Sequence, residues 1–331
     1  MVSRQTVSRV INEQTNIRDT TRERVLQVMR ELDYRPSRAA RMLATNRSRL
    51  VGVVATVNGV HYGPTRIIAA IEDAARANGY AVILTTVRNL SPVELADGVD
   101  HLVREGVEGI VAVAPQAHAL DAMSALAQPV PAVILQADGS RSDSGLSVDN
   151  ELGAALAARH LTGLGHRSVA MVSGPSDWSE AVARTRGFAH TVQASGAAIV
   201  GVAEGDWTAE SGYRACQQLL GTGATAVFCA NDQMALGLLH AVTDRGLRVP
   251  VDLSVVGFDD VPEAAHYLPP LTTIRQDFDE LGQRAVATLL SVVENGRATR
   301  RPPIPPHLIV RASTLPLASA LAAPRDPRPG L

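Results

Sequence analysis

The sequence of 331 residues contains no lysine, so all 31 of its Lys or Arg residues are arginine. That absence excludes Schiff-base chemistry, the phosphate-binding P-loop and other mechanisms that depend on a lysine amine. Cysteine is also scarce: Cys216 and Cys229 have no metal-ligand spacing and form no disulfide framework, which indicates a reducing compartment. No apolar run is long enough to span a membrane and no secretion leader is recognisable, so we expect a cytoplasmic protein.

The charge of the chain is divided unevenly. Residues 1–50 hold 11 arginines against five acidic residues, whereas the whole chain has a net charge of −2, so the remainder is acidic. With 46% hydrophobic residues, the chain can bury a sizeable core, and its length fits two or three compact units. A small basic head on an acidic body predicts a polyanionic partner for the head.

The first predicted helix starts at Arg4, after Ser3 as its cap. At about 100° per residue, its polar side chains gather on the face opposite to Val7, Val10 and Ile11. These polar residues are Arg4, Gln5, Ser8, Arg9 and Asn12. Arginine and glutamine can form paired hydrogen bonds with guanine and adenine in the major groove, and hydroxyls such as those of Thr6 and Ser8 suit phosphates. The alternative is an ordinary solvated helix face, which the charge of the head disfavours.

Two more helical segments are predicted in the head. Thr20 and Glu23 have the spacing of a capping box, which predicts the start of the second helix, and Pro36 ends it. The third segment, "SRAARMLATNRS", is basic and includes Leu43. The head is therefore predicted to be all-α.

The body alternates Val- and Ile-rich runs with helical stretches. The predicted strands are "RLVGVVATV", "YAVILTTV", "VEGIVAVAP", "PAVILQA", "SVAMVSG", "AAIVGVAEGD", "TAVFCAN", "LSVVGFDD" and "LTTIRQD". This rhythm predicts an α/β fold of parallel sheets with helices on both faces. The body is too long for one small sheet, so we expect two lobes that divide near 147–153.

Polar and aromatic residues follow several of these strands. Ligands of parallel sheets bind beyond the carboxyl ends of the strands. At or shortly after such ends the sequence has Trp178, Arg184, Trp207, Asn231, Asp259 and Gln276. Carboxylate, amide and guanidinium groups beside an aromatic ring suit a polyol ligand. The alternatives are helix caps or turns for the polar residues and core packing for the tryptophans. Asp232 and Asp260 are predicted to be caps rather than ligands.

Signals for catalysis are weak. Gly163 and Gly165 lack the third glycine of a dinucleotide-binding fingerprint, and no G-x-S-x-G elbow is present. None of the nine histidines has metal spacing with another, and His160 and His166, on either side of a helix end, are predicted to be surface or capping residues. We therefore expect neither an enzyme nor a cofactor.

Several long blocks resemble the lactose-repressor (LacI/GalR) family of bacterial regulators, in order, from residue 2 to about 315. They include "VSRQTVSRVINE", "TRERVLQVMRELDYRPSRAARML", "GPSDWSEAVARTRGF", "ANDQMALG" and "RGLRVPVDLSVVGFDD". The resemblance implies a partial helix-turn-helix head with a hinge helix and a two-lobed core like that of periplasmic binding proteins. It implies these limits: head 1–48; core 49–316, with an N-lobe of about 49–148 and 278–305 and a C-lobe of about 149–277 and 306–316; and a disordered tail 317–331.

The resemblance also assigns roles to residues of the head. Base contacts are implied for Arg4, Gln5 and Arg9, and phosphate contacts for Thr6, Ser8 and Asn12. Leu43 falls where the family inserts a wedge between base steps in the minor groove. These roles imply operator DNA as a partner.

In the body, the resemblance implies a small sugar effector. Arg184, Asn231 and Asp259 should bind its hydroxyls, and Trp207 should stack on its ring. Gln276, Phe278 and Trp178 should line the cleft. Leu152 stands in place of a family acid, which leaves the identity of the sugar open. The tail lacks a heptad repeat for a tetramerisation helix, so we expect a homodimer.

The family places one more helix before the first stretch quoted above. We therefore expect that this start is late or that the chain is a shortened form, with weak specific DNA binding. One rival interpretation is a sugar-binding module without DNA activity. The other is an α/β enzyme, which the missing catalytic constellation disfavours.

Overall fold

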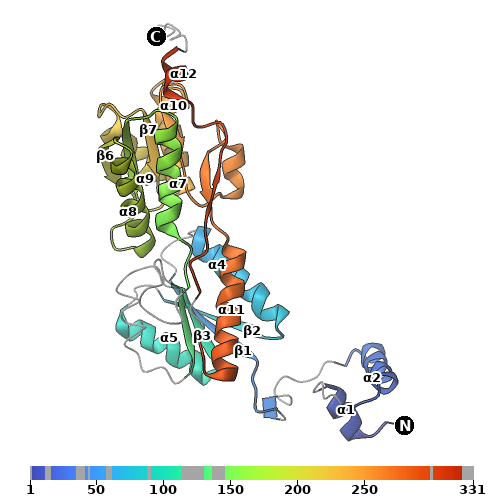
Figure 1. Cartoon of the computed structure of the whole chain (residues 1–331). Helices are drawn as coiled ribbons and strands as arrows, with labels where there is room; N and C mark the ends of the chain where they lie inside the picture. Colours follow the sequence, from blue (N-terminus) through green and yellow to red (C-terminus); the bar gives the residue numbers. More distant parts are fainter. Residues whose placement is uncertain are drawn as a thin grey trace.

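The computed structural model describes most of the chain. The described residues are 2–11, 16–34, 42–43, 45–56, 62–87, 91–113, 130–135, 146–298 and 301–322. Figure 1 shows a small helical head at the N-terminal end and an elongated body built of two layered units. None of the described helices is long and apolar enough to cross a membrane.

The head contains α1 (Arg4–Ile11) and α2 (Asp19–Glu31). As predicted, Ser3 caps α1: its hydroxyl accepts a hydrogen bond from the amide of Thr6 at 3.1 Å. The capping box predicted at Thr20 is wrong, because α2 begins at Asp19 and its N-cap residue is Arg18, without a side-chain cap. Val10 and Val25 are the buried apolar residues of the described part of the head, so its core is small.

The first sheet of the body, which with its helices we call the first lobe, has the strand order β2-β1-β3-β4. All its pairings are parallel. Its strands are β1 (Leu50–Thr56), β2 (Ala81–Val87), β3 (Gly109–Val113) and β4 (Ala132–Leu135). Helices α4 (Tyr62–Ala77) and α11 (Phe278–Asn295) pack on one face, and α5 (Pro92–Arg104) packs on the other. Helices thus cover both faces of the sheet, which agrees with the almost continuously apolar sequences of β1, β3 and β4, whereas the edge strand β2 is partly exposed.

The second sheet, which with its helices we call the second lobe, has the order β6-β5-β7-β8 and is also parallel. Its strands are β5 (Ser168–Ser173), β6 (Ala198–Glu204), β7 (Ala226–Cys229) and β8 (Ser254–Val256). Its helices are α7 (Asn150–Gly163), α8 (Ser179–Ala194), α9 (Ala209–Leu219), α10 (Asp232–Asp244) and the 3₁₀ helix η1 (Pro262–His266). Helices α7 and α8 cover one face, while α9 and α10 cover the other. The two parallel sheets confirm the predicted α/β fold.

The chain crosses between the lobes more than once. Helix α11 follows the second lobe in sequence but packs on the first, beside α4 (Figure 1). Two crossing segments are joined: the amide of Ile304 donates to Ser147 O, and the amide of Asp149 donates to Ile304 O, both at 2.9 Å. These backbone bonds tie the connections together at the point where the lobes meet.

The last part of the described chain differs from the prediction. The predicted strand at "LTTIRQD" is present as β9 (Thr273–Arg275), and two isolated parallel bridges, Val256–Thr272 and Asp259–Arg275, join this segment to the one that begins with β8. Its other side pairs antiparallel with β10 (His307–Ile309), a strand that the sequence does not predict. Residues 317–322 form a helix, α12 (Leu317–Ala322), so the predicted disorder does not hold for them. The rest of the predicted tail, 323–331, lies outside the described residues.

The surroundings of His160 and His166 also differ from the predicted surface or capping positions. His166 is buried: its Nδ1 lies 2.8 Å from the hydroxyl of Thr225 and its Nε2 lies 3.1 Å from Leu315 O. The Nε2 of His160 lies 2.9 Å from the hydroxyl of Thr314. Both side chains therefore connect the C-terminal segment at residues 314–315 with the second lobe. Burial lowers the pKa of each histidine.

Candidate functional site

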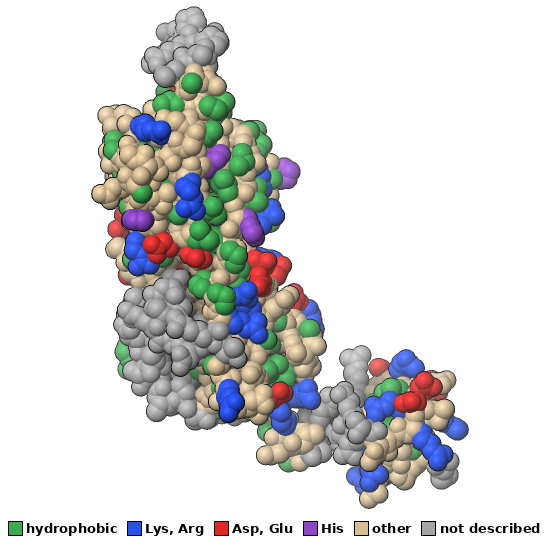
Figure 2. Space-filling model, in the orientation of Figure 1, with side chains coloured by type: hydrophobic (Ala, Val, Ile, Leu, Met, Phe, Trp, Pro, Cys, Tyr) green, Lys and Arg blue, Asp and Glu red, His purple; other side chains and the backbone are tan. Residues whose placement is uncertain are grey.

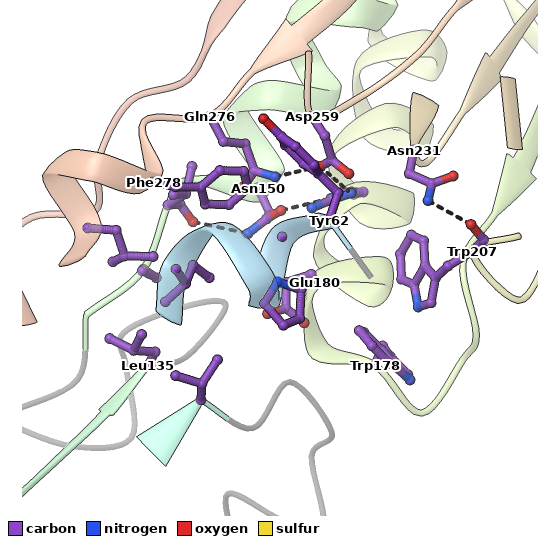
Figure 3. A pocket seen from close by; sticks show the side chains of 18 of the residues that line it. Tyr62, Leu135, Asn150, Trp178, Glu180, Trp207, Asn231, Asp259, Gln276 and Phe278 are labelled. Carbon is purple, nitrogen blue, oxygen red and sulfur yellow. Dashed lines mark hydrogen bonds and ion pairs between the residues drawn. The ribbon is translucent and has the colours of Figure 1, made fainter. Parts of the chain in front are cut away.

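A pocket of about 750 Å³, including space open to solvent, lies between the two lobes (Figure 3). The first lobe contributes the ends of β3 and β4 and the starts of α4 and α11, and the second lobe contributes α8 and the loops after its strands. Seven residues singled out from the sequence all line it: Trp178, Arg184, Trp207, Asn231, Asp259, Gln276 and Phe278.

A buried ion pair forms one wall of the pocket. The Nη1 atom of Arg184 lies 3.4 Å from Oδ1 of Asp259, and both side chains are nearly inaccessible to solvent. Arg184 also donates from Nε to Asn150 Oδ1 at 2.8 Å and from Nη1 to the carbonyl of Ala230 at 2.5 Å. Its guanidinium lies over the ring of Phe258, 3.9 Å from the centroid. These contacts hold the cation in one orientation.

The carboxylate of Asp259 is held from a second direction by Gln276, whose Nε2 donates to Oδ1 at 2.7 Å. Burial raises the pKa of Asp259 to about 6, while the charge of Arg184 and the hydrogen bond from Gln276 act in the opposite direction. At neutral pH the pair is therefore ionised, so the wall presents a carboxylate and a guanidinium side by side.

Two residues of the pocket have strained backbones. Trp207 has φ 72° and Asp259 has φ 109°, values that side chains other than glycine rarely adopt. Asn231 supports the first, because its Nδ2 donates to Trp207 O at 3.0 Å. Strain of this kind is often concentrated at binding sites, where the surrounding structure maintains it.

Aromatic rings from each lobe border the pocket. Trp178 and Trp207 from the second lobe have ring centroids 5.3 Å apart, tilted by 60°. Tyr62 and Phe278 from the first lobe have centroids 6.0 Å apart in an edge-to-face arrangement. In Figure 3 the two tryptophans lie on one side, and Tyr62 and Phe278 lie across from them. A ligand between these pairs would contact both lobes.

The pocket contains polar atoms without a partner. Among the described residues, the buried side-chain atoms that lack a hydrogen-bond partner are Thr85 Oγ1, Ser147 Oγ, Glu180 Oε2, Trp207 Nε1 and Thr288 Oγ1. Three of these five, on Ser147, Glu180 and Trp207, belong to residues that line the pocket. Because an unpaired buried polar group is costly, this concentration indicates a polar ligand.

Asn150, Ser147 and Glu180 were not among the residues predicted to bind a ligand. Asn150 and Ser147 lie within residues 147–153, where the sequence predicts the division between the two lobes. Glu180 precedes Arg184 by four residues on α8, and this spacing places both side chains on one face of the helix. That spacing is the sequence signal that could have indicated Glu180 as a further residue near Arg184.

The predictions for the acidic pairs need correction. Asn231, not Asp232, caps α10, and its Oδ1 accepts from the amide of Met234 at 2.9 Å. Asp232 is fully buried and accepts from the amide of Val261 at 2.9 Å and from the hydroxyl of Thr273 at 2.6 Å. Asp260 is not a cap either, because it forms ion pairs with Arg275 and Arg311, both at 2.6 Å. Neither Asp232 nor Asp260 lines the pocket.

The head presents most of its predicted DNA-contacting side chains to solvent. Arg4, Gln5, Ser8 and Arg9 of α1 are exposed, and Thr6 is half-buried beside Ser3. Leu43 is 88% exposed, which is unusual for a large apolar side chain. Asn12 lies outside the described residues. Figure 2 shows several basic side chains on the head.

A basic helical head joined to a two-lobed body with a pocket between the lobes defines a class: DNA-binding transcriptional regulators with an effector-binding domain. Residues 1–37 match the bacterial regulatory proteins of the lacI family, and residues 158–314 match the periplasmic binding protein-like domain. The lactose operon repressor of Escherichia coli (strain K12) is 36% identical over 331 residues, which cover 98% of this chain and 91% of the repressor. The chain therefore belongs to the lacI family.

Two further comparisons agree. The transcriptional repressor PurR of Histophilus somni (strain 129Pt) is 32% identical, with 94% of this chain and 95% of PurR covered. The crystal structure of the lac repressor dimer bound to operator and the anti-inducer ONPF has a TM-score of 0.81 at 36% identity, and covers 95% of this chain and 96% of that chain. These relatives are repressors rather than enzymes, which agrees with the non-enzymatic prediction. In the described part of the chain, no group of three or more His, Cys, Asp or Glu side chains could hold a metal ion.

Proposed function

We propose that this protein is a sugar-responsive transcriptional repressor, whose effector binds in the pocket between the lobes and changes the affinity of the head for operator DNA. The observation that carries the proposal is the pocket itself. It brings together an ion pair, two aromatic pairs and three unpaired polar atoms, from segments far apart in the sequence. This combination suits a polyhydroxylated ring, which has both hydroxyls to pair and apolar faces to cover.

Within the pocket, Arg184 and Asp259 bind sugar hydroxyls, and Trp207 stacks on an apolar face of the ring. Trp178, Gln276 and Phe278 line the cleft. Asn231 both caps α10 and supports Trp207, so its remaining hydrogen-bonding capacity for the sugar is small. Its main contribution is to hold the tryptophan in position.

In the head, Arg4, Gln5 and Arg9 read base edges in the major groove, while Thr6, Ser8 and Asn12 contact phosphates. Leu43 inserts between base steps in the minor groove. Its exposure supports this role, because no part of the described chain covers it. Two copies of the chain form a homodimer in the cytoplasm and place two heads on a near-palindromic operator.

Closure of the lobes around the sugar couples the two sites. The rings of Tyr62 and Phe278 lie at the starts of α4 and α11, so a sugar that pulls on them shifts the first lobe, to which the head is connected. A coupling of about 1–3 kcal/mol is enough to change DNA affinity by about 5- to 150-fold.

Selection of bound fragments from sheared genomic DNA of the source organism, with and without added sugars, tests the proposal. We expect the full chain, whose specific DNA binding is expected to be weak, to enrich a small number of near-palindromic fragments modestly over unrelated DNA, and one sugar to change their recovery. Enrichment that no sugar affects, or recovery of all fragments alike, would contradict the proposed function.

A further inference from the structure

Glu180 has an unusual place in the pocket. It is the second residue of α8 and lines the pocket one helical turn before Arg184. Its Oε2 atom is buried and has no hydrogen-bond partner among the described residues. Arg184 directs Nε and Nη1 to Asn150, the carbonyl of Ala230 and Asp259, so its charge acts on Glu180 without a hydrogen bond to Oε2.

The charges around the pocket are therefore unbalanced. The titratable side chains among its described lining residues are Tyr62, Glu180, Arg184 and Asp259. Among these lining residues, the two acids Glu180 and Asp259 share one cation, Arg184, which forms its ion pair with Asp259. Burial raises the pKa of Glu180 to about 7; the charge of Arg184 acts against this rise and that of Asp259 adds to it.

Stable binding next to Glu180 requires a ligand that supplies a hydrogen-bond donor for its Oε2 atom. A hydroxyl or an ammonium group of the ligand would donate to Glu180 and remove the cost of an unpaired acceptor. Above pH 7, where Glu180 is ionised, a ligand carboxylate or phosphate would instead place a second negative charge in the same buried space, where like charges repel strongly.

We propose that Glu180 determines the specificity of the pocket: it accepts a hydrogen bond from a donor group of the effector and excludes anionic sugars such as uronic acids and sugar phosphates. This inference rests on the proposed function, since it assumes that a sugar occupies the pocket. It adds the chemical class of that sugar, which is neutral or amino-substituted.

Calorimetric titration of the full chain with a defined panel at pH 8, above the pKa of about 7 for Glu180, tests the proposal. The panel contains glucose, galactose, lactose and cellobiose as neutral sugars, glucosamine and galactosamine as amino sugars, and galacturonate and glucose 6-phosphate as anions. The variants are Glu180→Ala and Glu180→Gln. Glu210→Gln is the matched control, because Glu210 is also the second residue of its helix, α9, but is exposed.

We expect the unsubstituted chain to bind at least one neutral or amino sugar and neither anion. Glu180→Ala should lower the affinity for this sugar by about tenfold or more. Glu180→Gln should reduce the ratio of the affinity for this sugar to the affinity for the anions by a similar factor. Glu210→Gln should change neither. A preference for the amino sugar over its parent that Glu180→Gln removes identifies an ammonium donor, and equal binding of the two identifies a hydroxyl.

The outcomes separate the two proposals. A chain that binds a panel sugar with variants indistinguishable from Glu210→Gln overturns the role of Glu180 and leaves the sugar site intact. Preference for galacturonate or glucose 6-phosphate also overturns it. A chain that binds no sugar of the panel counts against the proposed function and against Glu180 with it. If Glu180→Ala does not fold, Glu180→Gln, which keeps the size of the side chain, decides.

Discussion

Arg184 and Asp259 meet inside the pocket as a buried ion pair, with 3.4 Å between Nη1 and Oδ1, although 75 residues of sequence separate them. One stands on α8 and the other follows β8, so only the folded second lobe brings them together. Breaking a buried pair from one side leaves an uncompensated charge, which typically costs about 3–5 kcal/mol.

Asp259→Asn should therefore lower stability and remove the response to sugar. Asparagine keeps the shape but not the charge, so Arg184 loses its anion. We expect a decrease of about 3 kcal/mol in the free energy of unfolding, measured in denaturant, and no melting shift on addition of the effector. Asp206→Asn, which alters an exposed acid outside the pocket lining, is the control. A normal sugar-dependent melting shift in Asp259→Asn would show that the pair is not part of the site.

Gly174→Ala should displace Trp207. A Cβ atom on Gly174 would lie 2.2 Å from the indole ring, much closer than any non-bonded contact allows. We expect at least about a tenfold loss of sugar affinity, because the ring can no longer stack. Gly163→Ala is the matched control, since its Cβ would have no neighbour within 4 Å. Equal affinities in the two variants would mean that Trp207 does not contact the ligand.

Intrinsic fluorescence should report directly on the pocket. The chain has two tryptophans, Trp178 and Trp207, and both line the pocket. Binding of a sugar should change the emission of the unsubstituted chain, and Trp207→Phe should remove most of this change. Binding detected by calorimetry with unchanged emission would place the ligand elsewhere.

The stability of the protein should depend on pH through Glu180. Its pKa is raised from 4.5 to about 7 in the fold, so between these values the folded state keeps a proton that the unfolded state has released. Stability attributable to this group is therefore present at low pH and lost as pH rises through that window. Glu180→Gln should melt near the unsubstituted chain at pH 4.5 and above it at pH 8, as followed by circular dichroism. An equal difference at both pH values would contradict the raised pKa.

Arg9→Ala should separate base reading from phosphate binding in the head. If Arg9 pairs with a base, its loss should cost about 1–3 kcal/mol on a selected operator fragment and much less on unrelated DNA. Fluorescence anisotropy with both DNAs measures this. Arg24→Ala, an exposed arginine on α2, is a control for bulk charge. Equal losses on the two DNAs would make Arg9 a phosphate contact.

The sequence predicts most of the strands and the meeting of polar residues at their ends, because the period of apolar runs and the position of strand ends are local features. The buried roles of Asp232 and His166 are not local. Asp232 is satisfied by Val261 and Thr273, and His166 by Thr225 and Leu315, partners that lie 29 residues or more away. Strand β9 was found, but its antiparallel partner β10 has only three residues and is too short for a clear pattern.

Glu180 illustrates the same limit within the site. Its helical spacing to Arg184 is visible in the sequence, but that spacing usually indicates a surface ion pair. Only the structure reveals that Asn150, Ala230 and Asp259 accept hydrogen bonds from or pair with the arginine side chain and that Oε2 of Glu180 has no hydrogen-bond partner.

A sugar in the pocket is proposed to control the affinity of the head for operator DNA. One titration tests this coupling most directly. The affinity of the full chain for a selected operator fragment is measured with and without a saturating sugar identified by calorimetry. We expect the sugar to change this affinity by about 5- to 150-fold in the unsubstituted chain and to have no effect in Asp259→Asn. A sugar that binds the pocket yet leaves the affinity for DNA unchanged would contradict the account.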